Sequence, residues 1–281
     1  MTHSIGIGSA TVTLLEIASS RRSGEQLSEI FGGVPREDLA AAASATGDPP
    51  WAYTLALLAV GGRRILVDTG FGYHSGGPGV CTADLLAGAG VNAGDIDTVV
   101  ITHAHGDHIG ALISDGKPSF PSATLAIGEA EHVFWAGSAA AEHYGVERVG
   151  PVRDAMLEYR DATKLLRNGD PVCELDNASL RAYDAPGHTP GHIILLFESK
   201  GEAVWLLADT LHDPFQLVHL DWSPRFDVDP AQAVDTRRLI LSRVAESGAP
   251  AHLFHFAFPG IGMITRDGDQ YRFVPLAEPG E

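Results

Sequence analysis

Hydrophobic and polar positions along the first part of the chain predict strands. Polar and apolar residues alternate over residues 10–17, as they do in a half-buried strand. Residues 51–60 and 63–68 are two apolar runs joined by a Gly-Gly pair, and glycine readily supplies the positive φ angles of a tight hairpin turn. Between these strands, residues 19–50 have no clear period, so we expect a surface excursion around a short helix.

Helical and strand patterns alternate through the rest of the chain. Helices are predicted over residues 82–91, most of 129–167 and 229–248, and another is expected to open at residue 107. Strands are predicted over residues 97–102, 123–128, 179–188, 193–199, 203–210 and 251–258. Strand pairs at the start of both halves favour an α/β fold with mixed or paired sheets and outer helices over a doubly wound parallel sheet. No repeat or linker interrupts the pattern, so residues 1–281 are expected to form one domain.

The composition excludes several classes of protein. Of the 281 residues, 44% are hydrophobic and 20% are charged, which is typical of a chain that buries a sizeable core. The formal net charge is −17 and no run of Lys or Arg stands out, so neither nucleic acid nor a membrane surface is an expected partner. Two cysteines are too few for a disulfide framework. Without a signal peptide or a long apolar run, we expect a soluble cytoplasmic protein.

The stretch "ITHAHGDHIG" at residues 101–110 carries the strongest chemical signal. It places His103, His105, Asp107 and His108 within six positions, directly after a predicted strand. Residues two apart in an extended segment point the same way, so His103 and His105 can bind one metal ion. Asp107 and His108 then project elsewhere and can bind a second ion.

Three more candidate ligands follow at the ends of predicted strands. His188 lies in "DAPGHTPGH", where glycine and proline let the backbone bend close to a metal, and Asp209 ends the apolar run "VWLLAD". His255 follows a third strand in the same way. Each signal is weak alone, but together they predict a site for two divalent metal ions. Zinc is the first expectation, and Mn, Fe or Co are alternatives that His and Asp ligands also accept.

These motifs together resemble those of the metallo-β-lactamase-fold hydrolases, over nearly the whole chain from about residue 51. The motifs are "LVDTG", "THAHGDH", "APGHTPGH", "LLADT" and "HFAFPGIG". The resemblance implies a four-layer αββα sandwich with the metals at one edge, between two sheets. It implies that one metal is bound by His103, His105 and His188, and the other by Asp107, His108 and His255. It further implies that Asp209 bridges the two metals and that Asp68 lies behind the ligand loop and orients it.

The motifs also favour some branches of this family over others. True β-lactamases of this fold usually lack a bridging carboxylate such as Asp209. Glyoxalase II-type thioesterases carry a helical C-terminal domain with basic residues, whereas only Arg266 and Arg272 are basic after His255. The chain is most similar to lactonases, including acyl-homoserine lactone quorum quenchers, and to methyl-parathion-type phosphotriesterases. The expected reaction is lactone opening by a metal-bridging hydroxide; organophosphate triester hydrolysis is the main alternative. A mononuclear iron dioxygenase, a thioesterase or a metal-binding scaffold without catalysis remains a further alternative.

The resemblance also assigns roles around the metals. Asp209 and Asp107 are expected to act in catalysis, and His212 occupies the position where several lactonases have a substrate-contacting tyrosine. His212 would protonate the leaving group or support Asp209, and His74 would lie near the metals with Asp68. A substrate pocket is expected from a helical insertion at about 129–167 and from residues after the bridging aspartate: Phe134, Trp135, Tyr144, Met156, Phe215, His219 and Trp222. The expected substrate is a small neutral ester or lactone, and the expected assembly is a homodimer.

Overall fold

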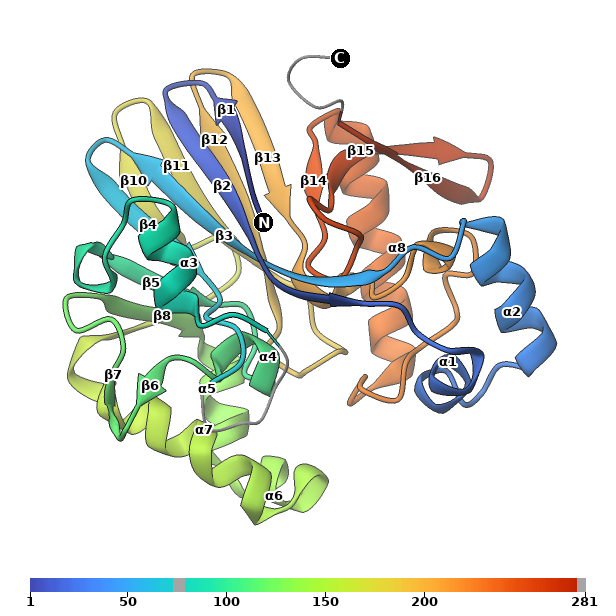
Figure 1. The fold of residues 1–281 in the computed structure, drawn as a ribbon, viewed down its shortest axis with the longest axis horizontal. Coiled ribbons are helices and arrows are strands. Elements are labelled where there is room, and N and C mark those ends of the chain that lie inside the picture. The colour runs from blue at the N-terminus through green and yellow to red at the C-terminus, as the bar shows by residue number, and fades with distance from the viewer. Residues whose placement is uncertain (73–78, 277–281) are drawn as a thin grey trace.

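The computed structural model describes residues 1–72 and 79–276, and these residues form two seven-stranded sheets (Figure 1). The first sheet has the order β1 (Thr2–Ile7), β2 (Ala10–Ser20), β3 (Trp51–Val60), β4 (Arg63–Val67), β5 (Thr98–Ile101), β8 (Thr124–Gly128) and β9 (Thr163–Leu166). The second has the order β10 (Pro171–Leu175), β11 (Ala178–Asp184), β12 (Ile193–Ser199), β13 (Glu202–Leu206), β14 (Ala251–His252), β15 (Ile261–Asp267) and β16 (Gln270–Pro275). Both sheets contain parallel and antiparallel pairs, and β6 (Ile113–Ser114) and β7 (Lys117–Pro118) form a separate small hairpin.

The described residues also form eight α-helices. They are α1 (Gly24–Ile30), α2 (Arg36–Ala45), α3 (Thr82–Gly88), α4 (Gly106–Ile109), α5 (Glu129–Ala136), α6 (Ser138–Tyr144), α7 (Val146–Glu158) and α8 (Pro230–Ser247). Short 3-10 turns span Ala93–Asp95, Arg160–Ala162, Ala208–Thr210 and Pro214–Leu217. One of these helices, α8, packs on the second sheet through Ile240, Leu241 and Val244. None of the described helices is long and apolar enough to cross a membrane.

Three apolar clusters build the layers. The inner faces of the two sheets share one buried cluster, in which Leu58 of the first sheet joins Leu195 and Phe197 of the second. A second cluster lies between the first sheet and α3, α5 and α7, and a third lies between the second sheet and α8. Helix, sheet, sheet and helix therefore stack in that order, and the αββα sandwich expected from the sequence is confirmed.

Several local predictions are confirmed and others are wrong. The Gly-Gly hairpin is confirmed: Gly61 and Gly62 adopt φ of 55° and 81° between β3 and β4, as a primed turn requires. The short helix expected within residues 19–50 is present as α1, and a second helix, α2, was not predicted. Residues 129–167 are largely helical, as predicted, but residues 163–166 form edge strand β9, which was not predicted. Only residues 251 and 252 of the predicted last strand pair, and strands β1, β10, β15 and β16 were not predicted.

The fold brings the loops that carry the histidine motifs to one edge of the sandwich. Strands β4 and β5 are parallel neighbours, as are β13 and β14. Their carboxyl ends therefore lie at the same edge of each sheet, where Asp68, His103, Asp209 and His255 follow them. The loop between β11 and β12 adds His188 from the second sheet. Ligand candidates from both sheets can thus meet between the two layers.

Candidate metal centre

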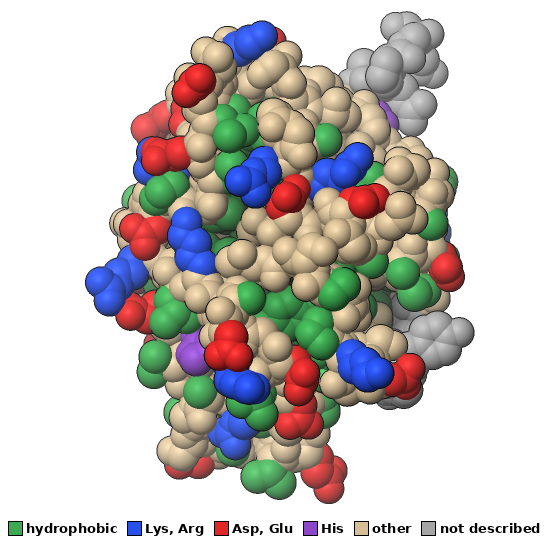
Figure 2. Space-filling view, turned by 90° about the vertical axis from the view of Figure 1, so that its left-hand side faces the viewer, with side chains coloured by type: hydrophobic (Ala, Val, Ile, Leu, Met, Phe, Trp, Pro, Cys, Tyr) green, Lys and Arg blue, Asp and Glu red, His purple; other side chains and the backbone are tan. Residues whose placement is uncertain are grey.

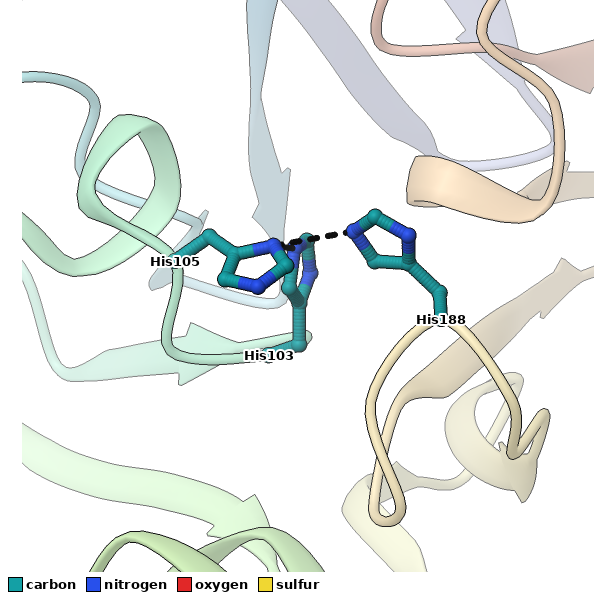
Figure 3. Close-up of side chains that lie close together, drawn as sticks. All are labelled: His103, His105 and His188. Atoms are coloured by element: carbon teal, nitrogen blue, oxygen red, sulfur yellow. Dashed lines mark hydrogen bonds between the residues drawn. The ribbon is translucent and has the colours of Figure 1, made fainter. Parts of the chain in front are cut away.

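The first group of ring nitrogens comes from both sheets. His103 Nε2 lies 3.0 Å from His105 Nδ1, which lies 2.9 Å from His188 Nε2 (Figure 3). These atoms belong to a cluster whose geometry could hold a metal ion. His105 keeps an extended backbone and caps α4, so it points back toward His103 instead of along the helix.

The second group consists of Asp107, His108 and His255. Asp107 Oδ2 lies 3.8 Å from His108 Nε2 and 3.7 Å from His255 Nε2. The side chain of Asp107 is 21% exposed, whereas those of His108 and His255 are 0% and 4% exposed. The second group therefore reaches solvent through its carboxylate.

Asp209 lies between the two groups. One carboxylate oxygen, Oδ1, is 3.1 Å from His108 Nε2, and the other, Oδ2, is 3.3 Å from His188 Nε2. Oδ2 is also 3.2 Å from His255 Nε2. Burial alone raises the pKa of Asp209, but His108 and His255 and their neighbours reverse this and hold the pKa well below its usual value. The buried carboxylate is therefore an anion placed to contact two cations at once.

Hydrogen bonds behind the rings orient their inward nitrogens. His108 Nδ1 lies 2.8 Å from Asp68 Oδ2, and His188 Nδ1 lies 2.9 Å from Asp227 Oδ1. An imidazole that donates to a carboxylate through Nδ1 keeps a lone pair on Nε2 when neutral. His108 Nε2 and Asp209 Oδ1 are buried and have no hydrogen-bond partner among the described residues. Buried acceptors that face one another in this way suit a divalent cation, so the residues present fit a pair of metal ions.

The histidines differ in charge state. Burial lowers the pKa of His108, but Asp209 and the other nearby aspartates outweigh it and raise this pKa well above its usual value, so a metal ion would displace a proton from His108. Burial holds the pKa values of His103 and His105 well below the usual value, so both rings are neutral and can coordinate. Burial also lowers the pKa of His188, but Asp209 and Asp227 outweigh it and raise this pKa to about 9. A metal at the first group would therefore displace a proton from His188, because only the neutral ring is a ligand.

Two buried residues show that the centre extends beyond the predicted ligands. Asp227, whose position carries no motif, orients His188 and has Oδ2 3.6 Å from Arg237 Nη2. Arg237 is 1% exposed and donates to the backbone oxygens of Thr210 and Leu220. Helix α8 thereby fixes both the His188 partner and the segment that follows Asp209.

Two residues at this edge have strained backbone angles. Asp68 and Ala208 have φ of 61° and 43°, in the left-handed region that costs a non-glycine residue about 1 to 2 kcal/mol. Asp68 accepts hydrogen bonds from Thr102 N and Thr102 Oγ1, at 2.8 Å and 3.1 Å. These bonds tie the strained residue to the start of the histidine loop.

The structure places His212 inside the centre. Its Nε2 is 3.2 Å from Asp209 Oδ2, and its ring stacks on His255 with centroids 5.1 Å apart. The side chain is 1% exposed, and burial lowers its pKa to about 4. His212 is therefore neutral near pH 7, and neither ring nitrogen has a hydrogen-bond partner in the described part of the chain.

The predicted pocket residues divide into two sets. Tyr144 OH lies 2.7 Å from His105 Nε2, and the Tyr144 ring stacks on Trp135 with centroids 5.0 Å apart and an angle of 4°. Phe134 packs edge-on against both. These three aromatic residues lie beside the first group.

The other predicted pocket residues contact different parts of the molecule. Met156 is buried in the cluster under the first sheet. Phe215 packs on Phe31 of the α1–α2 region and on Trp222, and Trp222 stacks on His219 at 3.9 Å. His74 lies outside the described residues.

Aromatic residues that the sequence analysis did not select lie closer to the second group. Tyr53 and Trp51 of β3 have ring centroids 5.0 Å and 5.4 Å from that of His255. Phe254 lies 4.0 Å from His108. Trp51 and Tyr53 begin the apolar run of β3, so the sequence pattern does not distinguish them from the core residues that follow in the same strand. Phe254 directly precedes His255, so the sequence does contain a signal for this residue.

Comparisons with known proteins agree with this geometry. The sequence profile described as the metallo-beta-lactamase superfamily matches residues 48–244. An uncharacterized protein of Bacillus subtilis (strain 168), YobT, is 29% identical over 108 residues, which are 38% of this chain. That match spans only 43% of the length of YobT.

Solved structures share the fold at low sequence identity. AidC, a dizinc quorum-quenching lactonase in complex with a product, has a TM-score of 0.90 at 22% identity, covering 99% of this chain and 98% of its own. Hydrolase AbOPH, in the beta lactamase superfamily, has a TM-score of 0.88 at 23% identity, with the same coverage of 99% and 98%. An N-acyl homoserine lactone hydrolase with N-hexanoyl-L-homoserine at its catalytic metal centre has a TM-score of 0.61 at 14% identity, covering 89% of this chain and 94% of its own. With its profile match over residues 48–244 and its His/Asp clusters at the edge between two sheets, this chain belongs to the metallo-β-lactamase superfamily.

Proposed function

We propose that this protein opens lactones such as N-acyl homoserine lactones, using two divalent metal ions, with zinc as the first choice. The observation that carries this proposal is the Asp209 carboxylate, which directs one oxygen to His108 of the second group and the other to His188 of the first. Two structural neighbours are described as lactonases or lactone hydrolases, which supports the same substrate class. The active unit is taken to be a single metallo-β-lactamase-like domain in a homodimer.

Each group of ligands has its own part in this proposal. One ion would be held by His103, His105 and His188, the other by Asp107, His108 and His255, and Asp209 would be a ligand shared by both sites. When bound, such a pair of ions lowers the pKa of a coordinated water to near neutrality and polarises the ester carbonyl. The chain itself supplies a fixed, buried anion at Asp209 that could orient a nucleophilic water and accept its proton. Asp107, the partly exposed ligand, lies where reactants reach the centre.

In this proposal, His212 has the role that a tyrosine has in several lactonases. Its pKa of about 4 makes the ring neutral near pH 7, so one nitrogen carries a proton and the other is an acceptor. Stacking on His255 fixes the ring within 3.2 Å of the Asp209 carboxylate. In this position His212 can pass a proton from Asp209 to the leaving alkoxide.

The aromatic residues beside the first group suit an acyl chain. Tyr144 and Trp135 present stacked rings next to His105, and Phe134 is half-buried beside them. On the face shown in Figure 2, acidic and basic side chains are interspersed among the described residues, without a continuous basic stripe. A small neutral substrate fits this surface better than a polyanion does.

The test follows proton release from an N-acyl homoserine lactone by the zinc-loaded protein, with a pH indicator. Asp209→Ala should reduce turnover by about a thousandfold, because it removes the anion shared by both groups. Asp235→Ala, at an exposed carboxylate on α8, is the matched control and should turn over normally. If the unmodified protein does not exceed the Asp209→Ala blank, the lactonase proposal fails. A phosphotriester is then the next substrate, because the "HDPFQ" and "FPGIG" stretches resemble those of methyl-parathion-type enzymes.

A further inference from the structure

Glu131 is a fully buried carboxylate that the proposed reaction does not use. It lies in the first turn of α5, with 0% of its surface exposed. Within the described part of the chain it forms no ion pair with Lys, Arg or His. A buried carboxylate without a cation is costly unless hydrogen bonds satisfy it, so its partners indicate why it is there.

Four donors surround this carboxylate, two on each oxygen. Oε1 accepts from Ala104 N at 2.8 Å and from Trp135 Nε1 at 2.7 Å. Oε2 accepts from Thr189 Oγ1 at 2.6 Å and from Gly191 N at 3.1 Å. Burial raises the pKa of Glu131, and these four hydrogen bonds oppose that rise by favouring the anion.

Three of the four donors lie on the two loops that supply the first group. Ala104 is the residue between His103 and His105, and Thr189 directly follows His188. One loop leaves the first sheet and the other leaves the second, so Glu131 joins the two layers at the metal edge. Its fourth partner, Trp135, stacks on the tyrosine whose hydroxyl lies 2.7 Å from His105.

Close packing leaves little freedom around this junction. A Cβ atom placed on Gly191 would lie 1.9 Å from the backbone nitrogen of Glu131. Likewise, a Cβ on Gly128 would lie 2.7 Å from the backbone oxygen of Gly191. The loop after His188 therefore presses directly on the start of α5, and only glycine fits at the contact.

The second group is fixed by other residues. His108 is oriented by Asp68, and His255 Nδ1 lies 3.3 Å from the backbone oxygen of Ala52. None of the four hydrogen bonds of Glu131 involves Asp107, His108 or His255. A change at Glu131 should therefore act on the first group and leave the second intact.

We propose that Glu131 is a positioning residue that sets the spacing between the His103–His105 loop and His188, and thereby the metal affinity of the first group. This rests on the metal-binding part of the proposed function and not on the identity of the substrate. Partners behind metal ligands commonly alter metal affinity by about ten- to a hundredfold. Glu131 differs from such partners because it holds the backbone of both loops and touches no ligand ring.

The test measures metal affinity, not turnover. Glu131→Gln keeps the shape but places an amide NH2 against donors that now face a carboxylate oxygen. In zinc competition with a chromophoric chelator, we expect two sites in the unmodified protein, and in E131Q one site weakened about ten- to a hundredfold with the other unchanged. Glu129→Gln is the matched control: it lies on the same helix, but its carboxylate pairs with Arg167 at the surface. E129Q should bind both ions normally.

The same substitution in a second variant identifies which of the two metal sites is weakened. In Asp107→Asn protein the second group is disabled, so E131Q should weaken the one tight site that remains. Thr189→Val removes a single donor to Glu131 and should weaken the same metal site to a smaller degree. This variant replaces E131Q in the test if E131Q does not fold. Equal weakening of both sites, or no change in either, would overturn the role of Glu131. Fewer than two zinc sites in the unmodified protein would instead refute the dinuclear centre, and this inference with it.

Discussion

The two groups of the metal centre are built differently. The first consists of imidazoles alone, and its members come from both sheets. The second contains a carboxylate, and this carboxylate, Asp107, is its partly exposed member, whereas the partly exposed member of the first group is an imidazole, His105. Each group has one buried aspartate behind a histidine: Asp227 behind His188 and Asp68 behind His108.

This difference suggests that the two groups have different functions, one retaining its ion and the other exchanging ligands. A group of three imidazoles offers only nitrogen ligands, which zinc binds well once the rings are neutral, so it should retain its ion. A group that includes an exposed carboxylate can exchange ligands with solvent and so accept a substrate oxygen. Asp209 couples the two, since each group lies within hydrogen-bonding distance of one of its oxygens.

Removing the exposed carboxylate should separate the two groups most clearly. Asp107→Asn takes the anionic ligand from the second group, so we expect metal content to fall from two ions to one per chain. The loss of one ion should reduce kcat/KM by several hundredfold, because a metal supplies several kcal/mol of transition-state stabilisation. Metal analysis and lactone kinetics measure both effects. Asp154→Asn, at an exposed position on α7, is the control, and full activity of D107N with a single ion would contradict the dinuclear proposal.

His212 tests whether the residue next to Asp209 is a ligand or a proton carrier. His212→Phe keeps an aromatic ring that can stack on His255 but removes both nitrogens. If His212 carries a proton, kcat should fall about a hundredfold while KM and both ions are retained. His219→Phe, which changes a ring stacked on Trp222, should have little effect. Loss of an ion from H212F would show instead that His212 is a metal ligand.

The sequence reveals the ligands of this centre more readily than the residues that hold them. His103 to His108 form a dense local motif after an apolar strand, and Asp209 marks the end of another. Asp227 and Glu131 carry no such signal, because the ligand loops that they contact lie 39 residues and at least 27 residues away along the chain. Their role depends on how the loops pack, which local pattern does not encode.

The same reasoning explains which elements of the fold were predictable. The β3–β4 hairpin and α8 have strong periodicity and clear turn or cap residues, and α8 begins with the Asp229 side chain accepting from Gln232 N. Helices α1 and α2 are short and rich in small or polar residues, and they are stabilised by packing with Phe215, far along the chain. Edge strand β9 has only four residues and buries only the last of them, so it lacks the apolar alternation that identifies a strand.

The aspartates behind the rings offer the finest test of the comparison between the two groups. Asp68→Asn should lower metal affinity about tenfold at the second group only, and Asp227→Asn should do so at the first, because each carboxylate orients one ligand histidine. Asparagine tolerates the left-handed backbone of Asp68 and matches its size, so the fold should persist. Chelator competition on the two variants provides the measurement, and each variant is the other's control. If both changes weakened the same site, the assignment of His108 and His188 to different ions would be wrong.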